Sequence, residues 1–433
     1  MRPLMMIRFS LAMILLLSTL TLLTGCGDSK TTTVVPPPNK PTGLPAPPAA
    51  TAVNTYSGAQ SPGAWLLTLD DNKSSFSYQP TTYPGSASSK ADGPFTVANG
   101  FKQLDGGGYA VEVQGRAAIL RPGNAATAPV FAVPQSACYA ITGRLRFQFI
   151  GMQTGPDGAV GNAGPTLGYG SMVASTDTSG KAWSFQDLQG NIVSGPTSFS
   201  GACSTSGPAT GIQLTGQTLL DNLWPPNETN QAAPTPATIS NVWIGPSGFL
   251  VADQSDPAAA SPLGASVAGL AEPSAALNTT DLESQRFAGF LYEPATVPFG
   301  GVTPTPIVTA PVAFGLVASP VATMTGGAYP NDDVTQTPNS DIQITLGKQD
   351  ATYNGLYRSV AITVLDPQQN CANYTGSGEK ATSGINAQGY FTCTFAGVAV
   401  AGNPEGKYAL MVTSYNWAVQ LGGAPMQLYL FQQ

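Results

Sequence analysis

The chain of 433 residues combines an apolar composition with few charges: 42% of its residues are hydrophobic and 9% are charged, against about 25% charged in ordinary globular proteins. It contains no histidine, which excludes Ser-His-Asp and Cys-His catalysis and any zinc, copper or non-haem iron site built on imidazole. The 17 basic and 24 acidic residues give a net charge of −7 and form no basic cluster, so nucleic acid is not an expected partner. The hydrophobic content is high enough for a buried core despite 49 glycines and 38 prolines.

The first 25 residues have the pattern of a bacterial export signal. A basic leader with Arg2 and Arg8 precedes the apolar run Phe9 to Leu23, which is shorter than the roughly 20 residues that a membrane-spanning helix needs. The run ends in Leu23-Thr24-Gly25-Cys26, which resembles the lipobox of bacterial lipoproteins. The resemblance implies cleavage before Cys26 and attachment of diacylglycerol and a further acyl chain such as palmitate, so that membrane lipid is a partner. The alternative is an ordinary secretory signal in which Cys26 is incidental.

The residues after Cys26 indicate where the anchor would place the protein. Enterobacterial lipoproteins that stay at the inner membrane tend to carry an aspartate directly after the lipidated cysteine, whereas here Gly27 stands there and Asp28 follows. The resemblance therefore favours the outer membrane within the cell envelope. Residues 26–50 contain seven prolines and no apolar periodicity, which is typical of an extended spacer that could reach up to roughly 70 Å at about 3.1 Å per residue.

Four cysteines follow Cys26, and an even number in an exported protein predicts disulfides. Three pairings are open; we favour Cys138 with Cys203 and Cys371 with Cys393, because each pair lies within one region of the chain. A four-cysteine metal site is the alternative, but the sequence has no Cys-x-x-Cys spacing.

From Thr51 onward the sequence is typical of strands joined by tight turns. Hairpins are predicted around residues 70–73, around Asn99-Gly100 and around residues 245–248. Residues 144–150 alternate with a period of two, Leu145, Phe147 and Phe149 on one face and Arg144, Arg146 and Gln148 on the other, which predicts a half-buried strand.

Helices contribute little to the predicted fold. The best candidate is Leu277 to Phe290, where we expect at most a short helical turn capped by Asn278 or Thr279. Strands at this spacing without crossover helices predict an all-β antiparallel meander with barrel-like or propeller-like architecture, in one or two β modules. The prolines between Pro294 and Pro311 suggest a main domain over 51–300 and a C-terminal β region over 301–433, either separate or a continuation.

Two further resemblances concern the β region. The stretch Tyr56 to Gly63 followed by Trp65 to Asp70 resembles a blade opening of lactonase-type propellers, but it occurs once, whereas a propeller would repeat it. Taken as a whole, the chain resembles uncharacterised Gly/Ser/Thr-rich exported β proteins of soil bacteria, a resemblance that implies no activity.

Few residues suggest chemistry. Ser377-Gly378-Glu379-Lys380 has the Ser-x-x-Lys spacing of penicillin-binding enzymes, but it lies in a Gly-rich stretch that predicts a solvated loop. Asn331, Asp332, Asp333 and Asp341 offer oxygens for calcium, but their spacing fits a polar turn better than a calcium loop. We therefore predict no catalytic residue, no metal site and no cofactor.

Carboxylates and tryptophans complete the candidates. Glycoside hydrolysis by paired carboxylates needs no histidine, but nothing in the sequence pairs any two glutamates. Trp224 is the candidate ligand-binding residue, because Trp224-Pro225-Pro226-Asn227 predicts a loop where a core residue is less expected, and an amphipathic aromatic suits sugars or peptides. The glutamates are Glu112, Glu228, Glu272, Glu283, Glu293, Glu379 and Glu405, and the other tryptophans are Trp65, Trp183, Trp243 and Trp417.

These observations favour a lipid-anchored cell-envelope protein with a non-catalytic β body. Its role would be binding of a glycan, a peptide or another envelope protein, or a purely structural role in an assembly. The alternative hypothesis is a carboxylate-dependent envelope hydrolase, either a glycoside hydrolase or a propeller-type enzyme.

Overall fold

A computed structural model describes most of the β region of the chain. The described residues are 43–46, 49–59, 64–80, 90–123, 128–135, 138–154, 166–187, 198–204, 211–214, 241–255, 264–293, 308–315, 323–365, 381–385, 389, 391–414 and 426–433. All of them belong to one compact unit, residues 37–433. The predicted all-β class is confirmed, with antiparallel strands arranged in two closed barrels and one curled sheet. Within these ranges no helix is long and apolar enough to cross a lipid bilayer.

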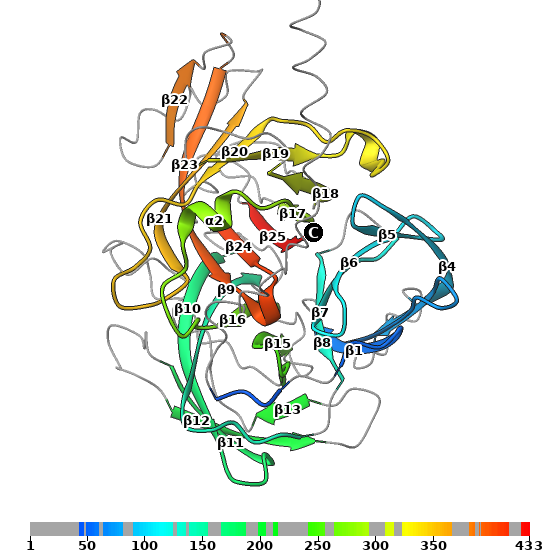
Figure 1. The fold of residues 1–433 in the computed structure, drawn as a ribbon, viewed down its shortest axis with the longest axis vertical. Coiled ribbons are helices and arrows are strands. Elements are labelled where there is room, and N and C mark those ends of the chain that lie inside the picture. Colours follow the sequence, from blue (N-terminus) through cyan, green and yellow to red (C-terminus); the bar gives the residue numbers. More distant parts are fainter. Residues whose placement is uncertain are drawn as a thin grey trace, which may run out of the picture. The chain divides into compact units, whose positions relative to one another are not determined.

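The first eight strands form a closed antiparallel barrel, in which each strand pairs with the next and β8 pairs back with β1 (Figure 1). Apolar side chains such as Leu67 and Phe76 fill its interior. The predicted hairpin at Asn99-Gly100 is present, and both residues have the positive φ, 48° and 83°, that a type I′ turn requires. The strands are β1 (Val53–Ala59), β2 (Ala64–Asp70), β3 (Ser75–Pro80), β4 (Ala91–Ala98), β5 (Phe101–Leu104), β6 (Tyr109–Val113), β7 (Ala117–Arg121) and β8 (Val130–Pro134).

The next eight strands form a second closed barrel, in which β16 pairs back with β9. Cys138 and Cys203 form the predicted disulfide, which ties the segment before β9 to β12. Cys393 is also disulfide-bonded, but Cys371 lies outside the described residues, so their pairing stays a prediction. The strands are β9 (Leu145–Thr154), β10 (Thr166–Thr176), β11 (Ala182–Asp187), β12 (Ser198–Ser204), β13 (Gly211–Leu214), β14 (Asn241–Ile244), β15 (Phe249–Ser255) and β16 (Gly264–Ala271).

A nine-stranded sheet follows in the order β21-β20-β19-β18-β17-β25-β24-β23-β22, and it curls so that β21 also pairs with β23. The predicted helical turn is present as α2 (Thr279–Glu283), where the side chain of Asn278 accepts a hydrogen bond from the Thr280 N–H. Short 3₁₀ turns cover Pro330–Asp332 (η3) and Pro404–Gly406 (η6). The strands are β17 (Phe287–Glu293), β18 (Val308–Phe314), β19 (Met324–Ala328), β20 (Ile342–Thr345), β21 (Leu356–Leu365), β22 (Ala381–Ile385), β23 (Phe391–Gly402), β24 (Ala409–Ser414) and β25 (Gln427–Gln432).

The predicted domain boundary at residue 300 falls between two strands of this sheet. β17 and β18 are antiparallel neighbours, with Phe287 opposite Phe314 and Glu293 opposite Val308. The third sheet therefore begins before the boundary and continues after it.

The two barrels and the curled sheet share an apolar core, here called the central junction, formed by side chains from all three. Phe101 of the first barrel makes edge-to-face ring contacts with Phe290 and Tyr329 of the curled sheet, at centroid distances of 5.9 and 5.6 Å. Phe249 of the second barrel packs in the same way against Phe431, at 5.4 Å. Strands at this junction therefore bury both of their faces. One face packs in the interior of their own barrel or curled sheet, and the other packs against a neighbouring one.

One arginine crosses the central junction. The Arg121 side chain, only 4% exposed, donates from Nη1 to the Thr309 carbonyl at 2.9 Å and to Asp332 Oδ2 at 2.6 Å, and from Nη2 to the Gly107 carbonyl at 3.2 Å. Its guanidinium also lies 4.6 Å from the ring centroid of Tyr109. Arg121 thus attaches β7 of the first barrel to two segments of the curled sheet.

We predict that Arg121→Gln lowers the free energy of unfolding by about 2–4 kcal/mol, because it leaves buried carbonyls and a carboxylate without their charged donor. Denaturant unfolding followed by tryptophan fluorescence measures the change. The matched control is Arg286→Gln, which removes the same charge from an exposed side chain and should change stability by no more than about 0.5 kcal/mol. Equal stability of the two variants would show that Arg121 does not hold the junction together.

Candidate functional site

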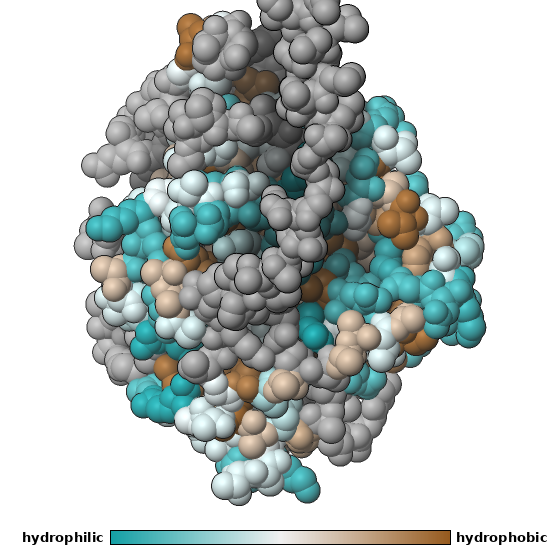
Figure 2. Space-filling model, viewed as in Figure 1, coloured by the Kyte–Doolittle hydropathy of each residue, from teal (hydrophilic) through white to brown (hydrophobic). Residues whose placement is uncertain are grey.

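On the face shown in Figure 2, the described residues are mainly teal to white, and brown appears in small separate spots between them. The exposed large apolar side chains of the described residues, Val53, Val97 and Ile385, lie on three different strands. A binding site is therefore better sought in a hollow than on an apolar face.

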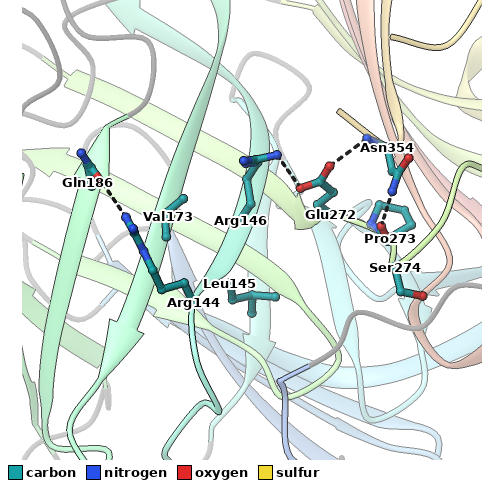
Figure 3. A pocket seen from close by; sticks show the side chains of 9 residues that line it. All are labelled: Arg144, Leu145, Arg146, Val173, Gln186, Glu272, Pro273, Ser274 and Asn354. Atoms are coloured by element: carbon teal, nitrogen blue, oxygen red, sulfur yellow. Dashed lines mark hydrogen bonds and ion pairs between the residues drawn. The ribbon is translucent and has the colours of Figure 1, made fainter. Parts of the chain in front are cut away.

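One such hollow is a cavity of about 490 Å³ at the outer face of the second barrel, here called the outer pocket (Figure 3). The second barrel supplies its floor, and the segments after β16 and before β21 supply its wall. Its lining consists of Arg144, Leu145, Arg146, Val173, Gln186, Glu272, Pro273, Ser274 and Asn354.

The floor is a row of cross-strand neighbours. Val173 on β10 lies opposite Arg146 on β9 and opposite Gln186 on β11. On the other side of β9, the Glu272 N–H donates to the Arg146 carbonyl at 2.8 Å. Because neighbouring side chains of a strand alternate between faces and Phe147 lies in the core of the barrel, this row faces outward. The antiparallel register therefore brings together a carboxylate, a guanidinium, an isopropyl group and an amide.

The Glu272 side chain is held by two contacts in the wall of the outer pocket. Its Oε2 lies 3.0 Å from Arg146 Nη1, and its Oε1 accepts a hydrogen bond from the Asn354 N–H at 2.9 Å. The Asn354 side chain in turn donates to the Pro273 carbonyl at 3.0 Å. Both oxygens of Glu272 are thus engaged, and the charge of Arg146 is balanced by its neighbour (Figure 3).

Arg144 differs from Arg146 in having a neutral partner. It is exposed, and its Nη2 donates to Gln186 Oε1. Among the residues that the structure describes, no carboxylate forms an ion pair with Arg144. A guanidinium has five N–H donors, so most of them remain for a ligand. With two guanidinium groups and one carboxylate, the lining of the outer pocket carries one net positive charge.

The segment that carries Asn354 is fixed by Asp350. Asp350 Oδ1 accepts hydrogen bonds from the backbone N–H groups of Thr352 and Tyr353, and Oδ2 accepts one from Arg358 Nε at 2.7 Å. Burial tends to raise the pKa of Asp350, but these hydrogen bonds and the charge of Arg358 outweigh it and lower the pKa. The Tyr353 ring lies 4.8 Å from the guanidinium of Arg146, which links this segment to the floor.

Several residues singled out from the sequence lie outside the described part of the chain, so the predictions about them stay predictions. Of the described tryptophans, Trp65, Trp183 and Trp243 are buried in the cores. The residues outside are Cys26, Trp224, Glu228, Cys371, Ser377, Glu379, Lys380 and Trp417.

Two of the residues considered for calcium have other partners. Asp332 binds Arg121, and Asp333 accepts hydrogen bonds from Thr335 and Gln336. The described ranges contain no group of three or more cysteines, aspartates or glutamates arranged to hold a metal ion.

Glu112 lies inside the first barrel, where its side chain is 3% exposed. It accepts a hydrogen bond from the Tyr56 hydroxyl at 2.6 Å and lies 3.2 Å from Lys102 Nζ, which also contacts Asp71. Burial, followed by the charge of Glu112, raises the pKa of Tyr56 well above its usual range. Because the Glu112 carboxylate and the Tyr56 ring are buried, we assign them to the core of the barrel rather than to a site.

The outer pocket itself was not predicted from the sequence. The alternation of residues 144–150 places Arg144 and Arg146 on one outer face, but it does not show that residues 272–274 and 354 rise beside them. Gln148, predicted on the same exposed face, is in fact 1% exposed, because the central junction covers that end of β9.

No protein-family model matches the chain, and a comparison with curated proteins found no match either.

We predict that Asp350→Asn lowers stability by about 1 kcal/mol at neutral pH, since it removes the charge that binds Arg358 and weakens the acceptor of two N–H groups. Because folding lowers the pKa of Asp350, its carboxylate stabilises the fold fully above the ordinary aspartate pKa of about 3.9. This stabilisation is lost as the pH falls through the lowered pKa. The difference between parent and variant should therefore shrink below about pH 3.9. Denaturant unfolding across pH 2–7 measures it, with Asp92→Asn, an exposed aspartate, as control. A difference that persists at pH 2 would contradict the assignment.

Proposed function

We propose that this chain is a lipid-anchored cell-envelope protein whose β body has a non-catalytic binding role. Support for the anchor comes from the lipobox-like Leu23 to Cys26 and the proline-rich spacer that follows. The observation that carries the binding role is the lining of the outer pocket, where two guanidinium groups and two amides surround an apolar floor. Such a lining offers many donors for holding a ligand and few groups for moving protons.

The hydrolase hypothesis finds no support in the outer pocket. Retaining glycosidases need two carboxyl groups about 5–5.5 Å apart, and inverting ones about 6.5–9.5 Å apart. Glu272 is the one carboxylate of the lining, and both of its oxygens already accept from Arg146 and Asn354. Glu112 and Asp71, which share Lys102, do not serve either, because Glu112 is enclosed in the first barrel.

The proposed location is the cell envelope, with the outer membrane favoured by Gly27 after Cys26. Acylation at Cys26 would hold the processed chain firmly, because several acyl chains together bind a bilayer far more strongly than one. The spacer over residues 26–50 would then carry the β body away from the lipid surface.

We predict that Cys26→Ala moves the protein from the membrane fraction to the soluble exported fraction, because the variant has no sulfur to acylate. Fractionation of cells that produce the full-length parent or the variant measures this, and mass spectrometry of the N-terminal peptide detects the acyl chains. Cys138→Ala is a matched control: it removes a different cysteine and should leave membrane partitioning unchanged. A Cys26→Ala variant as firmly membrane-bound as the parent would rule out the lipid anchor.

A further inference from the structure

We infer that the outer pocket binds the carboxylate of an acidic carbohydrate, with Arg144 as the cation that faces the ligand. The inference rests on the proposed binding role and adds the chemical class of the ligand. It is carried by the unequal pairing of the two arginines: Arg146 has Glu272 as counter-ion, whereas Arg144 has the neutral Gln186.

The charges of the lining select an anion. A carboxylate placed at Arg144 meets a guanidinium that has a planar fork of donors suited to two parallel hydrogen bonds. A cation placed there would meet Arg144 and Arg146 together, and Glu272 is too fully engaged to attract it. Gln186 accepts from Arg144 through Oε1, and Figure 3 shows its amide nitrogen on the side away from Arg144, where it can donate to a second ligand atom.

The remaining groups fit a sugar better than a peptide. Val173 provides an apolar surface in the floor with the Gln186 amide beside it, and Figure 3 shows Asn354 and Ser274 at the wall, beyond Arg146 and Glu272. A pyranose ring is complementary to these groups, because its faces carry apolar C–H groups and its rim carries hydroxyl groups. The many neutral donors and acceptors would bind hydroxyl groups, while Arg144 binds the acid group.

Peptides commonly bind β proteins by adding a strand to a free sheet edge. The floor of the outer pocket has no such edge, because β9 pairs with β10 and β16, and β10 pairs with β9 and β11. A peptide in this pocket would lack the main-chain hydrogen bonds that usually supply its affinity. We therefore assign the pocket to an acidic sugar and treat acidic peptides as an outcome of the test.

The test uses tetragalacturonate as the probe, with its fully methyl-esterified form as the neutral match and tetraglutamate as the peptide. Calorimetric titration of the full-length processed protein in nonionic detergent measures each affinity. We expect the acid sugar to bind and Arg144→Gln to weaken it by at least about tenfold, the value of one charge-assisted hydrogen bond. Arg144→Lys should fall in between, because it keeps the charge but loses the fork. Arg286→Gln is the control and should bind like the parent, and thermal unfolding should confirm that all variants are folded.

Each other result contradicts a distinct part of the inference. If the acid and its methyl ester bind equally, and Arg144→Gln changes neither affinity, recognition of a carboxylate would be overturned while the proposed binding role stays intact. If tetraglutamate binds, the sugar does not, and Arg144→Gln abolishes the binding, the assignment of the ligand as a carbohydrate would be overturned. Absence of binding by all three probes would overturn the inference as a whole, whereas the anchor at Cys26 is judged separately by fractionation.

Discussion

The fold depends on burial of strands on both of their faces at the central junction. A closed barrel already buries its inner face, and here β7, whose five residues are all buried, also packs its outer face against the curled sheet. Strands of this kind have little room for charged side chains, which explains how a long chain can contain only 9% of them. The same burial makes a charge at the junction costly, and Arg121 is tolerated because two carbonyls and Asp332 accept hydrogen bonds from its two terminal nitrogens.

Two pairs of charged side chains inside the protein have structural roles, and the outer pocket contrasts with both. Lys102 and Glu112 pair inside the first barrel, and Arg121 pairs with Asp332 at the junction, where the arginine side chain is buried. At the outer pocket the pairing is incomplete, because Glu272 balances Arg146 and leaves Arg144 with a neutral partner. At this pocket the incomplete pairing leaves guanidinium donors of Arg144 for a ligand.

Local features of this fold could be predicted from the sequence, whereas contacts between distant segments could not. Asn99-Gly100 determines its own turn, and Asn278 caps its own helix, because each effect acts over a few residues. Closure of the barrels depends on pairs such as Gly58 with Ala132, and the outer pocket depends on Asn354 reaching Glu272, which no local pattern encodes. For the same reason the alternation of β9 indicated its outward residues but not that Gln148 would be covered.

The net acidity of the chain does not oppose an anion at the outer pocket. Charges on the surface are screened over about 8 Å at physiological ionic strength, so a small ligand responds mainly to the groups that line its own site. Because the chain has few charges, few other charged side chains lie near that site. One guanidinium without a counter-ion therefore dominates the local electrostatic potential. The outer face of the second barrel provides the rigid support for this field, because Arg146 lies opposite Val173 in the sheet and Figure 3 shows the Arg144 and Arg146 side chains on either side of Val173.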